Sequence, residues 1–445
     1  MSSPALHLDE PAVSGPGSPN FFNGRLLTGE DLAAEQAFGR AADEALARLH
    51  GPGVAHGLDV TLEDAGAGGV PAVRVGAGAA VTAAGVMLAL ETSVRLELRR
   101  TPPPKGTAPS AFAQCTPSGP VAPGQAQLHL LTIGPAEPAP LGRARVVGLG
   151  DEPAPCAVDR IAPAVRMRLR PFAVALPPGL ATRLRNHVAA LLLGDIGETR
   201  APLADDPTAP AGGGLLERLR GTGYGADEVP LAVVRWPSAA EGVVFVDQWA
   251  ARRRCHQPGA YPPLGVTAAE RRAVLAEARL AQFQTQLAGL VNASRFSRAF
   301  VRDHFVSLPP AFVLPARIQR LIRPLPEFER LTGGPFGIGI RPLPFPFPFM
   351  GWDPAAFLGG LTVRREAWIE GARVGEVLAA AAQHPAIDAT ADRSEALWYH
   401  PIRPTGPGFQ AARHMLVVSG HVRYAANAQY DLAHYDQANY AVPTT

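Results

Sequence analysis

The sequence predicts a β-rich α+β protein, with several small antiparallel β-domains of sandwich-like form, an N-terminal amphipathic helix and proline-rich connectors. One observation behind this prediction is the helical spacing of apolar residues after Thr28. Another is the series of short, alternating or β-branched segments that follows, with glycine or aspartate turns between most of them. Glycine and proline, at 46 residues each and without a strict period, indicate many turns and long connections rather than collagen.

A helix is expected to begin after Thr28, a good N-cap residue, with Glu30 and Asp31 in its first turn. Carboxylates are favourable there because they compensate the exposed backbone N–H groups and the helix dipole. The helix should run for about six turns. A Gly-Pro-Gly sequence at residues 51–53 then ends it. Its apolar stripe is narrow and alanine-rich, and consists of Ala34, Phe38, Ala42, Ala45 and Leu49.

Two β-regions follow the helix. In the last segment of the first region, Val94, Leu96 and Leu98 alternate with charged residues, which is typical of a strand with one face in a core and one in water. The second region has segments of strong β composition with a helix between them. The expected strands are 54–62, 72–75, 79–82, 86–90 and 93–98 in the first region and 127–133, 158–170, 231–236 and 243–247 in the second, with the helix at 180–193.

The later part of the chain combines a helix, a proline-rich stretch and a third structured region. Thr267 and Glu270 form a capping-box pattern, which predicts a helix that reaches about Leu290. Prolines recur closely from residue 308 to 350, and such a run cannot be an interior strand because proline fixes φ and lacks an N–H donor. Beyond it we expect a helix at 374–382 and strands at 396–399, 415–419 and 421–424.

These patterns divide the chain into seven parts. The expected parts are a flexible arm (1–19), the first helix with a small β-domain (20–100), a linker (101–124), a second β-rich domain (125–265), a helix (266–300), a proline-rich connector (301–350) and a C-terminal α+β domain (351–445).

Composition excludes several classes of partner. The 41 basic and 39 acidic residues give a net charge of +2, which supplies no field for nucleic acid or an anionic membrane. The three cysteines, Cys115, Cys156 and Cys255, lack the spacing of a metal knuckle or a disulfide framework. The N-terminus has no basic leader with an apolar core, and no stretch of about eighteen apolar residues occurs. We therefore expect synthesis in the cytoplasm and no membrane insertion.

The polar clusters of the sequence do not form a recognisable catalytic or metal site. The most reactive-looking group is Asp247 with residues 252–256 (Arg-Arg-Arg-Cys-His), because three arginines would lower the pKa of a neighbouring thiol, but we favour a solvated charge run. The glycine-rich segment 332–339 lacks the Lys-Ser/Thr of a phosphate loop. We predict no catalytic residue, no cofactor and no metal site. Four further polar residues also fail to match zinc-site spacing, namely His414, His421, Asp431 and His434.

Aromatic residues suggest two kinds of contact. Residues 344–349 alternate proline and phenylalanine, and their exposed rings would favour aggregation. We therefore expect this segment to pack on its own or a neighbouring subunit rather than to bind a polyproline-recognising groove. A carbohydrate-binding surface would instead use exposed rings, and a cell-wall hydrolase would need two convergent carboxylates, which the sequence does not single out. The residues concerned are Phe345, Phe347 and Phe349 for packing, and Trp352, Trp368, Trp398 and Tyr399 for carbohydrate.

One resemblance covers about the first hundred residues. Phe-Phe-Asn-Gly-Arg-Leu-Leu-Thr-Gly-Glu-Asp-Leu-x3-Gln at 21–36, Leu-His-Gly-x-Gly-Val-x3-Leu-x-Val at 49–60 and Val-Arg-Val-Gly-x-Gly-Ala-Ala-Val at 73–81 carry it. These motifs resemble the N-terminal module of structural proteins of phage-tail-like contractile injection systems, including tail-fibre and baseplate proteins. The resemblance implies a non-enzymatic component of such a particle, baseplate-associated or fibre-like, that acts outside the cell that made it. It assigns no functional residue, because the pattern is a signature of fold.

A docking role leads to a prediction about the first helix. Its stripe, represented by Phe38 and Leu49, has no cover in the preceding arm, so we expect it to meet another helix or subunit. The expected partners are other baseplate or tail proteins and copies of the chain itself, with a trimer as the form that the resemblance implies. The open alternative is that the stripe packs on the sheet of residues 54–98.

Overall fold

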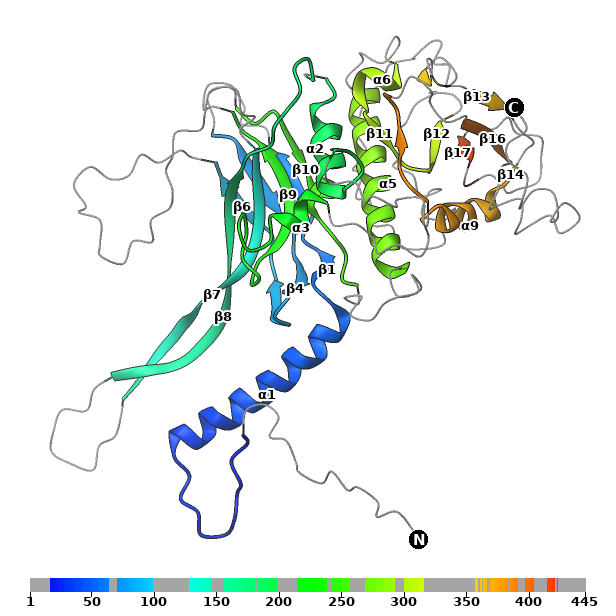
Figure 1. Cartoon of the computed structure of the whole chain (residues 1–445). Helices are drawn as coiled ribbons and strands as arrows, with labels where there is room; N and C mark the ends of the chain where they lie inside the picture. The colour runs from blue at the N-terminus through cyan, green and yellow to red at the C-terminus, as the bar shows by residue number, and fades with distance from the viewer. Residues whose placement is uncertain are drawn as a thin grey trace, which may run out of the picture.

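The computed structural model describes residues 17–63, 70–98, 128–145, 156–180, 182–197, 214–237, 242–256, 269–292, 300–315, 357–358, 361, 363–365, 369–382, 384–390, 397–403, 414–420 and 422. The expected linker at 101–124, the Pro-Phe segment with Phe345, Phe347 and Phe349, and most of the expected arm at 1–19 lie outside these residues. The predicted class is confirmed: the chain is α+β and β-rich, with several small sheets (Figure 1).

The first element is a helix that leaves the body of the molecule as a separate arm (Figure 1). This helix, α1, spans Gly29–His50 and begins after Thr28, the N-cap that the sequence predicts, which forms a capping box with Asp31. Two three-stranded antiparallel sheets follow it, in the orders β1-β4-β5 and β2-β3-β6. Their strands are β1 (Gly53–Gly57), β2 (Val60–Glu63), β3 (Ala72–Val75), β4 (Gly78–Val81), β5 (Met87–Leu90) and β6 (Val94–Glu97).

The predicted continuous strand at 54–62 is wrong, because the chain turns a corner at Gly57 and Leu58. Both residues have positive φ angles, 59° and 57°, so β1 and β2 enter different sheets. The Leu58 N–H donates to the carbonyl of Ala77 at 3.0 Å, and its side chain is fully buried. Burial and this hydrogen bond stabilise a backbone conformation that leucine seldom adopts.

A long hairpin dominates the next sheet. Its strands are β7 (Leu128–Arg145), which is much longer than the predicted 127–133, and β8 (Cys156–Phe172), which extends the predicted 158–170 by two residues at each end. Three prolines in β7 hide the residue pattern that would indicate a strand in the sequence. The strand tolerates them because β9 pairs with β7 only from Leu128 to Ile133. Beyond that point the described hairpin is a two-stranded ribbon (Figure 1). The sheet order is β10-β9-β7-β8, with β9 at Val229–Arg235 and β10 at Phe245–Asp247.

Both faces of this four-stranded sheet are buried near its centre. Leu131 and Ile133 share a core with Val54 and Val75 of the N-terminal sheets, so residues on both sides of the expected linker build one core. Leu128 and Leu130 point to the opposite face, which helices cover. These helices are α2 (Leu184–Leu193), α3 (Leu215–Arg218), α4 (Gln248–Ala251) and the long α5 (Ala269–Asn292).

A second core lies on the other side of α5. Phe283 of α5 packs against Phe305 and Phe312 with tilted rings, whose centroids are 5.0 and 4.6 Å apart. Residues 301–315, predicted to be the start of the proline-rich connector, thus contribute to this core. The remaining elements are α6 (Val301–His304), β11 (Ser307–Leu308), β12 (Ala311–Pro315), β13 (Val363–Arg365), β14 (Ile369–Glu370), α9 (Gly371–Ala381), β15 (Ile387–Asp388), β16 (Leu397–Arg403) and β17 (His414–Ser419).

The C-terminal sheet differs from the prediction in two ways. Its order is β12-β17-β16-β13, and both β13 and β14 pair with β16 in parallel, so it is mixed rather than antiparallel. The strand predicted at 421–424 is also wrong at Val422, which is helical and buried in the second core. Among the helices of the described residues, none has the length and apolar character needed to cross a membrane.

Candidate functional site

The most unusual surface of the described chain is α1. None of its 22 residues is buried, although its sequence is amphipathic. Phe38 and Leu49, the two large residues of the predicted stripe, keep 42% and 63% of their surface exposed. Leu32 and Leu46, which lie outside the predicted stripe, are also more than half exposed and widen the apolar band. A helix usually hides such a band against a partner.

The structure contradicts the alternative that the stripe packs on the sheet of residues 54–98. Only the last turns of α1 touch the body, where Arg48 Nη1 donates to the carbonyl of Ala84 at 3.0 Å. At the same junction, Gly85 lies directly against the backbone of α1. A Cβ added to this glycine would be 2.1 Å from the Glu44 carbonyl oxygen. The helix is therefore held firmly at one end and is free of the sheet along the rest of its length (Figure 1).

Residues 17–28 run beside the start of α1 and add to its apolar surface. Ser18 Oγ donates to Glu35 at 2.6 Å, and Arg25 forms an ion pair with Asp31, so this segment is tied to the helix. The apolar residues of the segment nevertheless point outward. Those at least half exposed are Phe21, Phe22, Leu26 and Leu27.

The reactive-looking group at Asp247 and residues 252–256 is a structural junction. Asp247 is buried, accepts from Arg185 Nε at 2.7 Å and caps α4 by accepting from the Ala250 N–H. Arg252 donates to the carbonyl of Gly57 and to Asp59, which holds the corner between β1 and β2. These charges are paired within the protein, so the predicted solvated charge run is wrong for them.

Arg253, Arg254 and Cys255 serve the same junction. The guanidinium of Arg253 donates to four backbone carbonyls, those of Leu192, Trp249, Ala250 and Arg252. Desolvation lowers its pKa to about 10, so it remains charged at neutral pH. The backbone beside it pairs with β1, with Val54 N donating to the Arg253 carbonyl at 2.8 Å and Cys255 N to the Val54 carbonyl at 3.1 Å.

Burial raises the pKa of the Cys255 thiol, and this effect exceeds the lowering by backbone hydrogen bonds and by Arg254. The sequence had suggested that three arginines would lower this pKa. Of the three, Arg254 alone lowers it, as the smallest of these effects, because Arg252 and Arg253 bond to other groups and Arg254 itself forms an ion pair with Glu277 at 3.2 Å. A thiol of raised pKa is a poor nucleophile at neutral pH.

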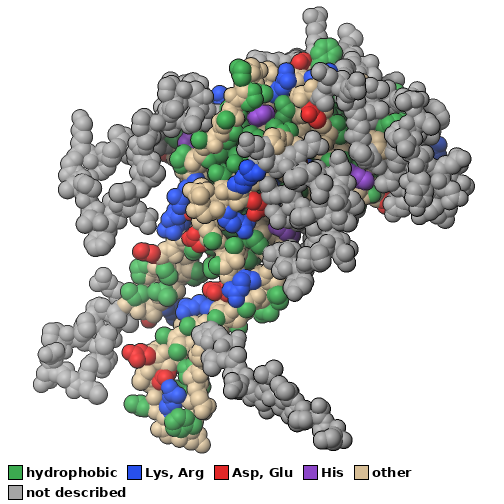
Figure 2. Space-filling view, in the orientation of Figure 1, with side chains coloured by type: hydrophobic (Ala, Val, Ile, Leu, Met, Phe, Trp, Pro, Cys, Tyr) green, Lys and Arg blue, Asp and Glu red, His purple; other side chains and the backbone are tan. Residues whose placement is uncertain are grey.

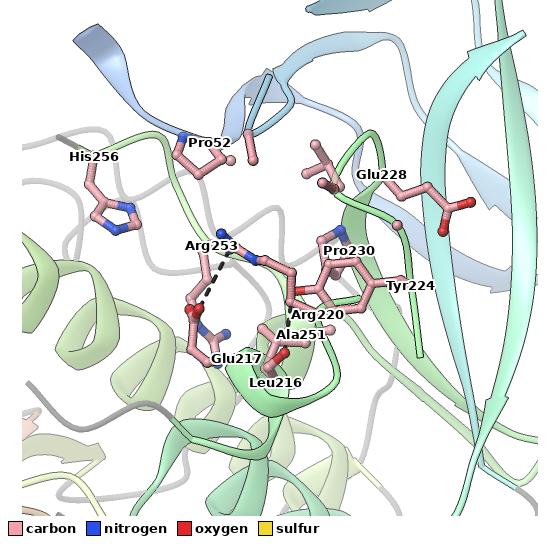
Figure 3. A pocket seen from close by; sticks show the side chains of 15 residues that line it. Pro52, Leu216, Glu217, Arg220, Tyr224, Glu228, Pro230, Ala251, Arg253 and His256 are labelled. Carbon is pink, nitrogen blue, oxygen red and sulfur yellow. Dashed lines mark hydrogen bonds and ion pairs between the residues drawn. The ribbon is translucent and has the colours of Figure 1, made fainter. Parts of the chain in front are cut away.

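A small crevice lies beside this junction, between the end of α1 and the loop that precedes β9 (Figure 3). Its volume of about 30 Å³ is room for roughly one water molecule, far below the size of a small-molecule site. Arg220 pairs with Glu217 at 3.6 Å, and Tyr224 Oη donates to the Leu216 carbonyl at 3.2 Å. These polar groups already have partners, so the crevice offers no evident chemistry.

The remaining polar and aromatic candidates do not form a site among the described residues. Trp398 is buried in the second core and Tyr399 packs partly buried against it, so neither offers a flat exposed ring for carbohydrate. The described residues contain no group of three metal-ligating side chains. Trp352, Trp368, His421, Asp431, His434 and the glycine-rich segment 332–339 lie outside the described residues.

The sequence interpretation missed a second exposed apolar surface, on the ribbon of β7 and β8. Leu141, Val158 and Ile161 are 50%, 52% and 64% exposed there. The sequence predicts the long strand at 158–170, but the prolines of β7 hide the matching part of its partner beyond residue 133, so the ribbon is not expected from the sequence.

Comparison with known proteins gives no assignment. No protein-family model matches the chain, and a search of curated proteins finds no match.

Proposed function

We propose that the protein is a non-enzymatic structural component of a phage-tail-like contractile injection particle, baseplate-associated or fibre-like, and that it works by docking to other subunits. The particle follows from the resemblance of residues 21–81, and the docking role is supported by the surface of α1. The single observation that carries the docking role is that a well-formed 22-residue amphipathic helix buries none of its residues in its own chain.

The proposal is supported by the apolar side chains that α1 leaves exposed to solvent. Burying a leucine or phenylalanine side chain contributes on the order of 1.5 to 3 kcal/mol. Phe38, Leu46 and Leu49 stay largely exposed in the chain alone, so a partner that covered them would gain much of this free energy. The capping box at Thr28 and seven alanines favour the helix before docking. A preformed helix loses less conformational entropy when it binds.

The proposed partners are further copies of this chain and other baseplate or tail proteins. Closed rotational symmetry is the usual form of such assemblies, and the resemblance favours a homo-oligomer, with a trimer as the specific expectation. Assembly takes place in the cytoplasm, and the finished particle acts outside the cell.

The test replaces two residues of the stripe, Phe38→Asp and Leu49→Asp. Two charges on the apolar side should dissociate the oligomer into folded monomers, as measured by size-exclusion chromatography with light scattering. Circular dichroism should show an unchanged helix content apart from α1.

A matched control is Ala33→Asp with Arg40→Gln, which makes the same net charge change on the opposite side of α1 and should leave the mass unchanged. A wild-type chain that is monomeric at micromolar concentration, and that does not copurify with a sheathed particle, would contradict the proposal.

A further inference from the structure

Two arms leave the same end of the body (Figures 1 and 2). One is α1, and the other is the distal ribbon, which comprises residues 134–145 of β7 and 156–166 of β8. In the described chain the distal ribbon pairs with no third strand. In Figure 1 both arms run toward the lower left, α1 buries none of its residues against the ribbon, and the end of α1 is fixed to the body through the hydrogen bond between Arg48 and Ala84. The chain's own helix therefore leaves its own ribbon uncovered.

One face of the distal ribbon combines apolar and basic residues. The register pairs Leu141 with Arg160 and Arg143 with Val158, and directly paired residues share a face. Leu141 and Val158 thus lie on one face with Arg160, while Ile161 lies on the other. We call the first of these the Leu141 face. Arg160 is 81% exposed and approaches Asp159 only at 3.8 Å, a surface pair that contributes little.

The charges of the two arms are complementary. Helix α1 contains five carboxylates and two arginines, a net charge of −3. The distal ribbon contains four arginines and two carboxylates, a net charge of +2. Two copies of α1 would repel each other, whereas α1 and a ribbon attract, and such complementarity selects partner and register.

The two arms also match in length. A 22-residue helix is about 33 Å long, and 12 residues of strand span about 40 Å. A helix about 10 Å wide covers roughly 330 Å² on each partner, so the two contacts of a reciprocal dimer bury roughly 1,300 Å² in total, whereas each interface of a closed ring holds one contact and buries roughly 660 Å². The area in the dimer falls within the range of about 1,200 to 2,000 Å² typical of stable interfaces.

We propose that α1 of one copy docks on the Leu141 face of the distal ribbon of a second copy. Phe38 packs there against Leu141 and Val158, and Leu49 lies about 16 Å farther along the helix on the same ribbon. The carboxylate of Glu35, which also accepts from Ser18, lies near Arg160. Each chain carries one helix and one ribbon. In a reciprocal dimer or a closed ring, every helix therefore has a ribbon to dock on and every ribbon is covered by a helix. This inference rests on the proposed docking role of α1 and names its partner surface.

The first test places two charges on the Leu141 face, Leu141→Asp with Val158→Asp. We expect the dissociation constant of the oligomer to rise at least about tenfold, because buried apolar contacts at an interface centre carry most of its affinity. Ile161→Asp, on the opposite face of the same ribbon, is the control and should change the constant by less than about twofold. All three substitutions lie outside the described cores, so circular dichroism and the melting temperature should match those of the wild type.

The second test reverses a charge on each arm. Glu35→Arg alone and Arg160→Glu alone should each weaken association about threefold or more at low salt, because each creates a like-charge pair. The chain that carries both substitutions restores an opposite pair and should return to within about twofold of the wild type.

The outcomes separate this inference from the proposed function. Dissociation by Phe38→Asp with Leu49→Asp, combined with no effect of the ribbon variants, would show that α1 docks elsewhere and would overturn this inference alone. Equal disruption by Ile161→Asp and the Leu141-face variant would overturn the choice of face. No effect of any of these variants would contradict both proposals.

Discussion

Glu228 shows how a single buried charge is accommodated in the four-stranded sheet. Only 4% of the residue is exposed, yet it accepts from Arg168 and Arg170 of β8 and from Thr132 Oγ1 at 3.2 Å. Burial alone would raise the pKa of this carboxyl group, but the hydrogen bonds from Arg170 and Arg168 outweigh it and the pKa is lowered. The carboxylate therefore stabilises the folded state in its ionised form.

We predict that Glu228→Gln lowers the free energy of unfolding by about 1 to 2 kcal/mol near pH 7, because both arginines lose a charged partner while keeping some contact with water. A lowered folded-state pKa gives stability that is fully present above the unfolded value of about 4.3 and is lost as the pH falls through the folded value. Urea unfolding of both proteins from pH 7 to pH 3 should therefore show the difference shrinking with acidity. A constant difference would mean that Glu228 acts through packing alone.

At the scale of elements, the junction between α1 and the β4–β5 turn decides where the arm points. Gly85 has a φ of +89°, and an added Cβ would also meet Arg48 Cγ at 2.9 Å. Thr82 supports the turn, since its Oγ1 accepts from the Val86 N–H at 3.0 Å. The rest of α1 contacts only residues 17–28 in the described chain and not the body, so the direction of the helix depends on this junction.

We predict that Gly85→Ala lowers the free energy of unfolding by about 2 kcal/mol or more, because it combines an unfavourable φ with a clash against the helix backbone. Trypsin should also cleave faster after Arg40 and Arg48. Gly24→Ala is the matched control, since Gly24 has a similar φ of +92° and no atom within 4 Å of the added Cβ. Similar losses in the two variants would show that the clash is relieved without moving α1.

At the scale of the whole molecule, buried amides join the two cores on either side of α5. Asn186 of α2 donates to Gln282 of α5 at 3.1 Å. Its Oδ1 accepts from the backbone N–H groups of Val306 and Ser307, at 2.8 and 3.0 Å. Gln282 continues the network to Asp247 at 3.0 Å. Fully paired buried networks of this kind fix the relative position of the elements that they link.

We predict that Asn186→Ala lowers the free energy of unfolding by about 2 to 4 kcal/mol, because it leaves two buried N–H groups without an acceptor. Calorimetry should then resolve two transitions where the wild type shows one. Thr182→Ala is the control, because it removes an exposed hydrogen bond to the Asp303 carbonyl between the same parts of the chain. A single transition in Asn186→Ala would show that the cores remain coupled through apolar contacts.

The sequence by itself determined the local elements of this protein, because each depends on neighbours along the chain. The capping of α1 at Thr28, its end before the Gly-Pro-Gly sequence at residues 51–53, and the existence of α2, β3, β9 and β17 followed from spacing and end signals. Only the tertiary structure decided what these elements touch. It placed Arg252 on the corner at Gly57, almost two hundred residues away in sequence, and left Phe38 uncovered. The length of the β7–β8 ribbon also depended on tertiary context, because whether a strand tolerates proline depends on whether a third strand lies beside it.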